Sequence, residues 1–142
     1  MAVNKNEKMI EYLSEYPKLD SFLKFNTIDN YPGERSVSTV YDDAWEIRHI
    51  RNHGSKRYDF AMIFIQPHDT GSSTLNATEM FDTEKFMEWI DEQNKQKHFP
   101  DFGEDADIIS IENLQNMPNL AGISESGTVA KYMIQCRVRY FV

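Results

Sequence analysis

The chain has a single cysteine and no long apolar stretch. Cys136 stands alone among 142 residues, so neither an internal disulfide nor a metal-binding pair of closely spaced cysteines can form. The longest uninterrupted apolar run covers residues 60–65 and is far too short to span a bilayer. The first residues lack the apolar stretch of a signal peptide. We therefore expect synthesis in the cytoplasm and no association with a membrane.

Basic residues are scarce relative to acidic ones. The chain has 15 lysines and arginines against 23 aspartates and glutamates, which gives a formal net charge of −8. A potential of this sign repels phosphate backbones and anionic lipids, so we expect no specific DNA binding and no membrane partner. The negative charge does not argue against transient contact with DNA, because a surface along which DNA must slide works better if it binds DNA weakly.

Internal repeats, low-complexity tracts and linkers are also lacking, and the length suits one domain, so we expect a single domain over residues 1–142. Apolar spacing predicts a short helix over 6–16 and a second helix over 82–95, with Asp82 as its cap. Residues 66–81 show no periodicity and predict a long connection. The predicted class is α+β, a mainly antiparallel sheet with two principal helices packed on it.

Strand patterns account for most of the remaining chain. Alternation of apolar and polar side chains is clearest between Tyr132 and Tyr140, and it places Cys136 on the inward face as a small buried hydrophobe. We interpret three successive strands in the first half as an antiparallel meander and expect a loop over 113–119. The predicted strands are 23–25, 36–41, 45–50, 58–65, 107–111 and 132–140. Turn chemistry separates them at 29–33, 42–43 and 51–55.

One short motif matches an enzyme signature, that of aspartic proteases: Asp69, Thr70, Gly71, Ser72 and Ser73. In those enzymes a carboxylate in a tight turn shares a proton with a second carboxylate. Here Pro67 and His68 precede the motif in place of a buried apolar strand, and a single copy would need a dimer to supply the second aspartate. We therefore interpret the motif as a loop tip and expect no catalytic residues.

Metal and cofactor sites are not predicted. His49 and His53 have a spacing that suits zinc on a helix, but Gly54 and the strand-like flanks argue against a helix there. The acidic residues between 101 and 107 do not match the ligand spacing of a calcium loop. We expect ordinary surface imidazoles and a solvated acidic turn.

The polar face of the last strand supplies candidates for contacts between subunits. Lys131, Arg137 and Arg139 gather positive charge on that face in a chain that is otherwise acidic. A solvated face and a contact with acidic groups of a neighbouring subunit are both open, since arginine can pair bidentately with a carboxylate. Reversing Arg137 and Arg139 together should weaken association and leave the fold intact if both are exposed strand charges. The loop at 69–74 is a further contact candidate on account of its charge and of the length of the connection that contains it.

Several short segments, in this order, resemble a family of minor capsid or tail-terminator proteins of siphophages and prophages of Gram-positive bacteria. The segment FMEWIDEQN at 86–94 is followed by an acidic stretch with Pro100, and AKYMIQCRVRY closes the chain at 130–140. KRYDFA at 56–61 and GIS at 122–124 fit the same pattern. The resemblance extends from about Leu23 to the end.

The resemblance implies a structural virion protein and no enzyme. Tail terminators form a closed homo-oligomeric ring, typically a hexamer, at the head-proximal end of the tail tube, where they stop tube polymerisation and join tail to head. The implied partners are further copies of the chain, the tail-tube protein and the head-tail connector. The implied location is the tail or neck of a virion assembled in the host cytoplasm. The alternatives are another head-tail joining protein, an adaptor or stopper, and remotely an aspartic-type hydrolase that uses Asp69.

Overall fold

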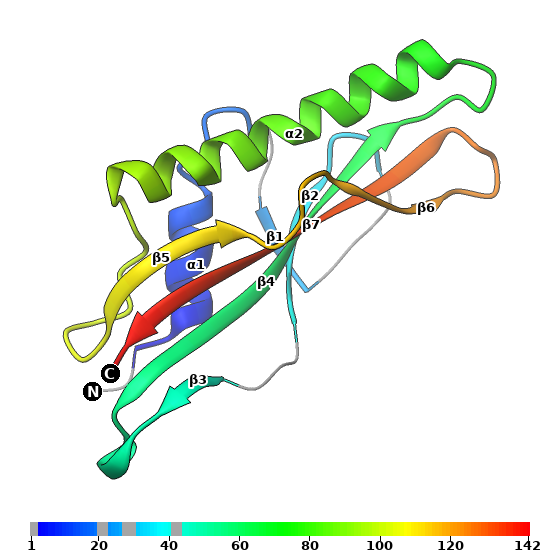
Figure 1. Cartoon of the computed structure of the whole chain (residues 1–142). Helices are drawn as coiled ribbons and strands as arrows, with labels where there is room; N and C mark the ends of the chain where they lie inside the picture. The colour runs from blue at the N-terminus through cyan, green and yellow to red at the C-terminus, as the bar shows by residue number, and fades with distance from the viewer. Residues whose placement is uncertain (1–2, 20–22, 27–30, 41–43) are drawn as a thin grey trace.

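The computed structural model describes residues 3–19, 23–26, 31–40 and 44–142. Within these ranges the chain is an α+β protein, in which two α-helices pack on a seven-stranded, mostly antiparallel sheet (Figure 1). The predicted fold class is therefore confirmed at this level. The elements are α1 (Lys5–Leu13), β1 (Leu23–Phe25), β2 (Arg35–Thr39), β3 (Trp45–Arg48), the 3-10 turn η1 (Ile50–Asn52), β4 (Gly54–Pro67), α2 (Ser73–Gln96), β5 (Asp107–Asn113), β6 (Asn119–Ile123) and β7 (Val129–Phe141).

Two long antiparallel strands, β4 and β7, form the centre of the sheet. Their register runs from Ser55 opposite Phe141 to Pro67 opposite Val129. Each is flanked on its outer side by two short strands that follow one another along its length, β3 and β2 beside β4, and β5 and β6 beside β7. β1 extends the β2 edge as a parallel strand. The sheet is therefore long and narrow, with two different edges.

The predicted meander is wrong in its pairing. β2 pairs with the middle of β4, where Thr39 lies opposite Phe60, whereas β3 pairs with its beginning, where Arg48 lies opposite Gly54. β4 is longer than the predicted strand, because polar residues from Gly54 onward also pair with the end of β7. It therefore has room for both short strands on one side. The predicted turns at 29–33 and 42–43, and the strand end at 41, lie partly or wholly outside the described residues.

The helix α2 begins at Ser73, well before the predicted cap at Asp82. Ser72 is the N-cap, and its Oγ accepts a hydrogen bond from the Leu75 N–H at 3.2 Å. The Gln66 side chain also donates to the Asp82 carboxylate at 3.3 Å, which holds the helix beside β4. The predicted long connection over 66–81 is therefore wrong, and only a short turn separates β4 from α2.

The core lies between the two helices and one face of the sheet. All inward positions predicted for the last strand are buried, Cys136 among them, which confirms the alternation. Phe86 of α2 contacts the rings of Phe64 on β4 and Tyr16 after α1, with centroids 5.7 and 5.3 Å apart. These contacts place α1 and α2 on the same face of the sheet. The opposite face carries no helix among the described residues (Figure 1).

The sequence interpretation missed β6. Leu120 and Ile123 are flanked by alanine and glycine, a stretch too short and too weakly patterned to predict a strand. The element forms because β7 presents an unpaired edge at residues 130–133, with which β6 pairs in an irregular register. The predicted loop therefore ends at Met117 and Pro118, and an edge strand follows it.

Candidate assembly surface

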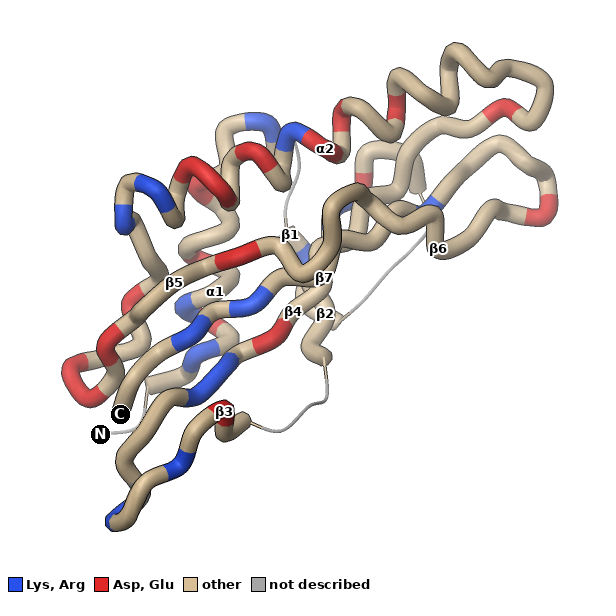
Figure 2. The backbone as a smooth tube through the Cα atoms, in the orientation of Figure 1, with Lys and Arg blue, Asp and Glu red and all other residues tan. Residues whose placement is uncertain are grey.

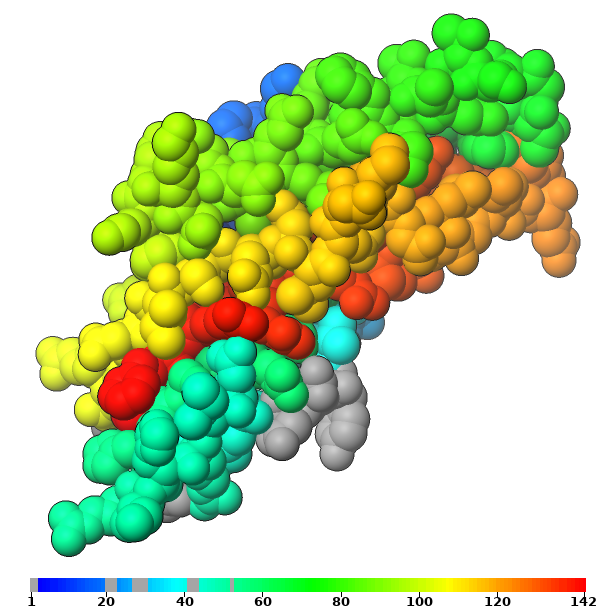
Figure 3. Space-filling model, viewed as in Figure 1, coloured from blue at the N-terminus to red at the C-terminus, as the bar shows by residue number. Residues whose placement is uncertain are grey.

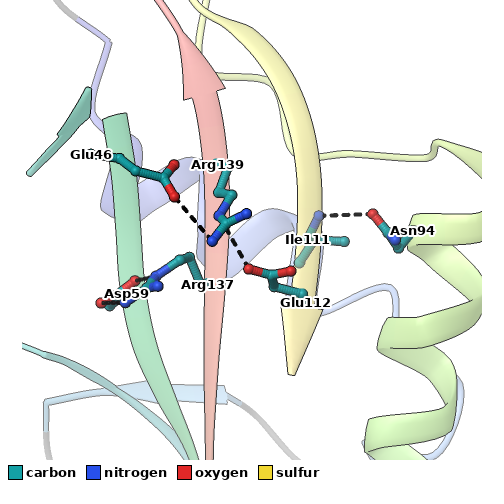
Figure 4. A network of polar contacts seen from close by, with 7 residues as sticks. All are labelled: Glu46, Asp59, Asn94, Ile111, Glu112, Arg137 and Arg139. Atoms are coloured by element: carbon teal, nitrogen blue, oxygen red, sulfur yellow. Dashed lines mark hydrogen bonds and ion pairs between the residues drawn. The ribbon is translucent and has the colours of Figure 1, made fainter. Parts of the chain in front are cut away.

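The helix-free face of the sheet carries an ordered set of charges. Paired residues of antiparallel strands point to the same side, so Arg57 and Arg139 share this face, as do Asp59 and Arg137. The neighbouring strands add Glu46 from β3 and Glu112 from β5 (Figure 4). The structure therefore places acidic partners from the same subunit next to both arginines that the sequence indicated.

Arg137 makes a bidentate pair with Asp59. Its Nε and Nη2 donate to the two carboxylate oxygens at 2.7 and 3.0 Å, in the fork geometry that suits guanidinium and carboxylate. The Arg137 side chain is 17% exposed and that of Asp59 only 5%. The expectation that Arg137 is an exposed strand charge is therefore wrong, and its reversal would place a second carboxylate beside a buried one.

Arg139 has a more open environment. Its guanidinium lies between Glu46 and Glu112, with Nη2 3.0 Å from one carboxylate and Nε 3.2 Å from the other. The Arg139 and Glu112 side chains are each 36% exposed, so solvent screens their attraction and each pair contributes at most about 1 kcal/mol. Arg139 therefore remains available to a neighbouring subunit in a way that Arg137 does not.

Apolar side chains lie uncovered beside these charges, at the end of the sheet that holds the C-terminus. Ile47 of β3 lies opposite Ser55, and Ser55 lies opposite Phe141, so one row crosses three strands on the helix-free face. Ile47 is 55% and Phe141 45% exposed. Ile109 is exposed at the irregularity in β5 nearby. Ile47 and Phe141 thus flank Ser55 in one exposed row, and clustered exposed apolar side chains can form part of a surface that another protein covers.

The strand β6 offers a second surface of this kind. It pairs with β7 on one side, and among the described residues no strand lies on its other side. Leu120 and Ile123 are both nearly half exposed, and the strand carries no charged side chain. An apolar edge without charge or proline is a template for pairing with another chain unless it is covered.

The segment from Asp69 to Ser73 is a capping turn for α2. Asp69 Oδ1 accepts a hydrogen bond from the Gly71 N–H at 2.9 Å, and the Ser72 N–H donates to the Asp69 carbonyl at 3.0 Å. The Asn76 side chain bonds the backbone N–H and carbonyl of Asp69, at 3.1 and 2.8 Å. Thr70 lies against the turn at Gly127. These bonds explain the motif as a helix start, which supports its interpretation as a loop tip.

The contact candidates do not form one patch. Lys131 and the turn from Asp69 to Ser73 lie near the β6–β7 turn, at one end of the central strand pair. Arg137 and Arg139 lie toward the other end, near β3 and the C-terminus. Lys131 also lines a small cavity of about 150 Å³ with Ile65, Ile123 and Val129. Any assembly that uses all these residues therefore needs more than one contact area.

Two further surface features escaped the sequence interpretation. The turn between β3 and β4 carries Ile50, which is 87% exposed, together with basic side chains on both sides. A groove between α2 and the segment after β5 carries three carboxylates. For the turn between β3 and β4, the sequence did contain a signal, because Ile50 is an apolar residue within an otherwise polar turn. The second joins segments far apart in sequence, so no local pattern could indicate it.

Cys136 is enclosed in the core and donates through Sγ to Asn113 Oδ1 at 3.5 Å. Burial raises the pKa of its thiol, and the nearby Asp91 carboxylate raises it further, so the reactive thiolate is suppressed. We expect a thiol reagent such as dithionitrobenzoate to label the native protein at least about 100-fold more slowly than the urea-unfolded protein. Comparable rates in the two states, measured by absorbance, would contradict this burial.

No group of three or more His, Cys, Asp or Glu side chains in the described part of the chain is placed to hold a metal ion. Among the same residues, no helix has both the length and the apolar character needed to cross a membrane. No protein-family model matches the chain. A search of curated proteins gives no match either.

Proposed function

We propose that the chain is a virion structural subunit, a tail terminator of a long-tailed phage that closes into a ring at the head-proximal end of the tail tube. The observation that carries self-assembly is the uncovered apolar edge of β6 together with the exposed row of Ile47 and Phe141. The phage assignment rests on the resemblance of the segments at 56–61, 86–94 and 130–140. In this role the subunit stops tube growth and presents a surface to the head connector.

The physical argument for a ring starts from the two different edges of the sheet. One edge is formed by β1 and β3, and the other by β5 and β6. A contact that joins unlike surfaces is head-to-tail, and it either closes into a ring or propagates as a filament. Closure covers each uncovered edge with a neighbour and leaves none free to aggregate. A closed ring therefore protects the exposed surfaces of this subunit.

The acidic composition suits a ring around passing DNA. The net charge of −8 opposes tight contact with phosphates, and a channel that must release DNA benefits from weak binding. An adaptor or stopper of the head-tail junction would share this property and differ mainly in its neighbours. The hydrogen bonds of the Asp69 turn serve helix capping, so no observation favours a hydrolase over these assembly roles.

Light scattering coupled to size exclusion tests self-assembly directly. We expect a discrete species whose mass is a multiple of 16.7 kDa, about 100 kDa for a hexamer, at micromolar concentrations. Addition of purified tail tubes of the cognate phage should then cap one tube end, as seen by negative-stain microscopy. A strict monomer that also leaves tube ends uncapped would contradict the proposal. A monomer that forms rings only on tube ends would show that the tube acts as a template.

A further inference from the structure

The turn between β3 and β4 is a basic projection in an acidic protein. Residues 45–57 contain four basic side chains and one acidic side chain, while the whole chain carries −8. Ile50 at the tip is 87% exposed, the largest exposed fraction among the uncovered large apolar side chains of the described residues. Arg51 beside it is exposed and makes no ion pair within the described part of the chain. Figure 2 shows this hairpin as an extension at one end of the sheet, with its basic positions in blue.

The hairpin has a defined shape. The His49 N–H donates to the His53 carbonyl at 2.6 Å, and Gly54 forms two backbone hydrogen bonds with Val142, at 3.2 and 2.9 Å. Lys56 and Arg48 both lie over the Trp45 ring, 4.4 and 5.0 Å from its centroid. These contacts shape the base of the hairpin, and Ile50 and Arg51 project from it at the exposed tip.

The groove between α2 and residues 113–117 has the opposite charge. It has a volume of about 440 Å³ and is lined by Glu84, Glu88 and Asp91 of α2, with Met87 and Met117 as its apolar part. Figure 3 shows the segment that follows β5 lying against α2 on the visible face.

Side-chain amides keep this groove in shape. The Asn113 amide donates to the Met87 carbonyl and to Asp91 Oδ1, both at 3.0 Å. The Gln115 amide donates to the carbonyls of Met117 and Met133, at 2.7 and 2.9 Å, which fixes the segment to β7. The groove is therefore formed before any partner binds, and binding needs no ordering of the loop.

We propose that the β3–β4 hairpin of one subunit docks into the α2 groove of the next, with Ile50 against Met117, which is 48% exposed, and with Arg51 and Arg48 facing Glu84 and Glu88. This contact rests on the proposed self-assembly and adds to it a contact area separate from the β6 edge and from the row of Ile47 and Phe141. Charge complementarity selects a second copy as the occupant: α2 carries six acidic and two basic side chains, and the hairpin carries the local basic excess. The Met117 side chain supplies an adaptable apolar surface for the isoleucine, and the buried Met87 forms the floor of the groove behind it.

One subunit cannot satisfy this contact by itself. The hairpin base pairs with Val142, while the groove begins at Asn113, which lies opposite Cys136 on β7. Six residues of strand separate these positions, a distance of about 20 Å. The turn between β3 and β4 extends away from α2 and from the segment after β5 (Figure 1). The contact therefore joins unlike surfaces of two copies, as a closed ring requires.

Two charge-reversed proteins test the inference. The hairpin variant carries Arg48→Glu with Arg51→Glu, and the groove variant carries Glu84→Lys with Glu88→Lys. In each protein the hairpin and the groove then have the same sign, so we expect each variant alone to lose the ring and elute as a monomer. Glu104→Lys with Asp105→Lys adds the same charge as the groove variant at an exposed turn outside the groove, and it should assemble like the unmodified chain.

Mixing the two variants makes the test specific. Every hairpin then finds a groove of opposite charge on the other protein, so an equimolar mixture should recover the ring mass with the two chains in a one-to-one ratio by native mass spectrometry. Recovery would also show that both variants are folded. Each new contact should weaken with salt, with an association constant lower by about tenfold or more between 0.05 and 0.5 M sodium chloride.

The negative outcomes separate the interface from the function. If the unmodified chain forms rings and both variants also form them, the hairpin does not dock in the groove, while the ring proposal stands. If the folded variants are monomers and their mixture stays monomeric, the hairpin and groove are not partners, and the inference fails. If the unmodified chain forms no ring alone or on tube ends, self-assembly fails and the inference fails with it. Hairpin binding only to the tail-tube protein would also overturn it.

Discussion

Arg137→Met should lower the free energy of unfolding by about 3–5 kcal/mol. The substitution leaves the Asp59 carboxylate, whose side chain is only 5% exposed, without the two hydrogen bonds that Arg137 donates. An uncompensated charge that is shielded from water accounts for a cost of this size. Urea unfolding followed by circular dichroism should show a lower midpoint with an unchanged slope, because the same surface is exposed on unfolding.

Two further variants isolate the cause of this loss. Arg139→Met removes an arginine from the same strand face, but its partners Glu46 and Glu112 are 26% and 36% exposed and so are better solvated than Asp59, and the expected loss is about 1 kcal/mol or less. Asp59→Leu combined with Arg137→Met removes both charges and should recover most of the stability that the single substitution loses. Equal losses for Arg137→Met and Arg139→Met would show that the pair with Asp59 has no special role.

Phe86→Ala should cost about 3–5 kcal/mol of unfolding free energy. The ring is fully buried and packs edge-on against Tyr16 and Phe64, so its removal opens a cavity between both helices and the sheet. The surrounding rings come from β4, from α2 and from the segment after α1, so they cannot collapse together into the space. Thermal or urea unfolding of the purified variant measures the loss.

Trp89→Ala is the matched control on the same helix. Trp89 contacts the rings of Tyr12, Tyr16 and Phe86, but it is only partly buried at the edge of the core. Part of the space left by the indole is open to water, so the expected loss is smaller than that for Phe86→Ala. A larger loss for Trp89→Ala would show that the contact between α1 and α2 contributes more than the contact of α2 with the sheet.

The sequence by itself determined the elements whose pattern is local. The alternation in β7 placed Cys136, Ile134 and Val138 inward, and the structure buries all three. A side chain on a strand points to a face that its position alone decides, so a period of two predicts burial without knowledge of the partner strand. The short helical repeat before Pro17 and the apolar run in β4 are also local patterns, and the sequence predicted a helix and a strand there. These patterns were sufficient for the α+β class.

Tertiary structure decided the elements that depend on a distant partner. Residues 73–81 include four poor helix formers, Ser73, Thr74, Asn76 and Thr78, and lack a clear apolar period, and they become helical because Ser72 caps them and Gln66 and Met80 hold them on the sheet. β6 exists only beside the free edge of β7. Short segments of low intrinsic preference adopt the conformation that their neighbours stabilise, and no local window contains those neighbours.

The same distinction applies to the candidate site. The sequence identified Lys131, Arg137 and Arg139 as an unusual basic strand face, because charge and periodicity are local properties. Strand register then paired Arg137 with Asp59, a residue 78 positions away, and left Arg139 more exposed. Folding also formed the groove between α2 and Met117 and extended the basic hairpin away from it. The sequence thus determined where the basic side chains stand along the strand. The fold determined which carboxylate each of them meets, because strand pairing brings together residues that are far apart in sequence.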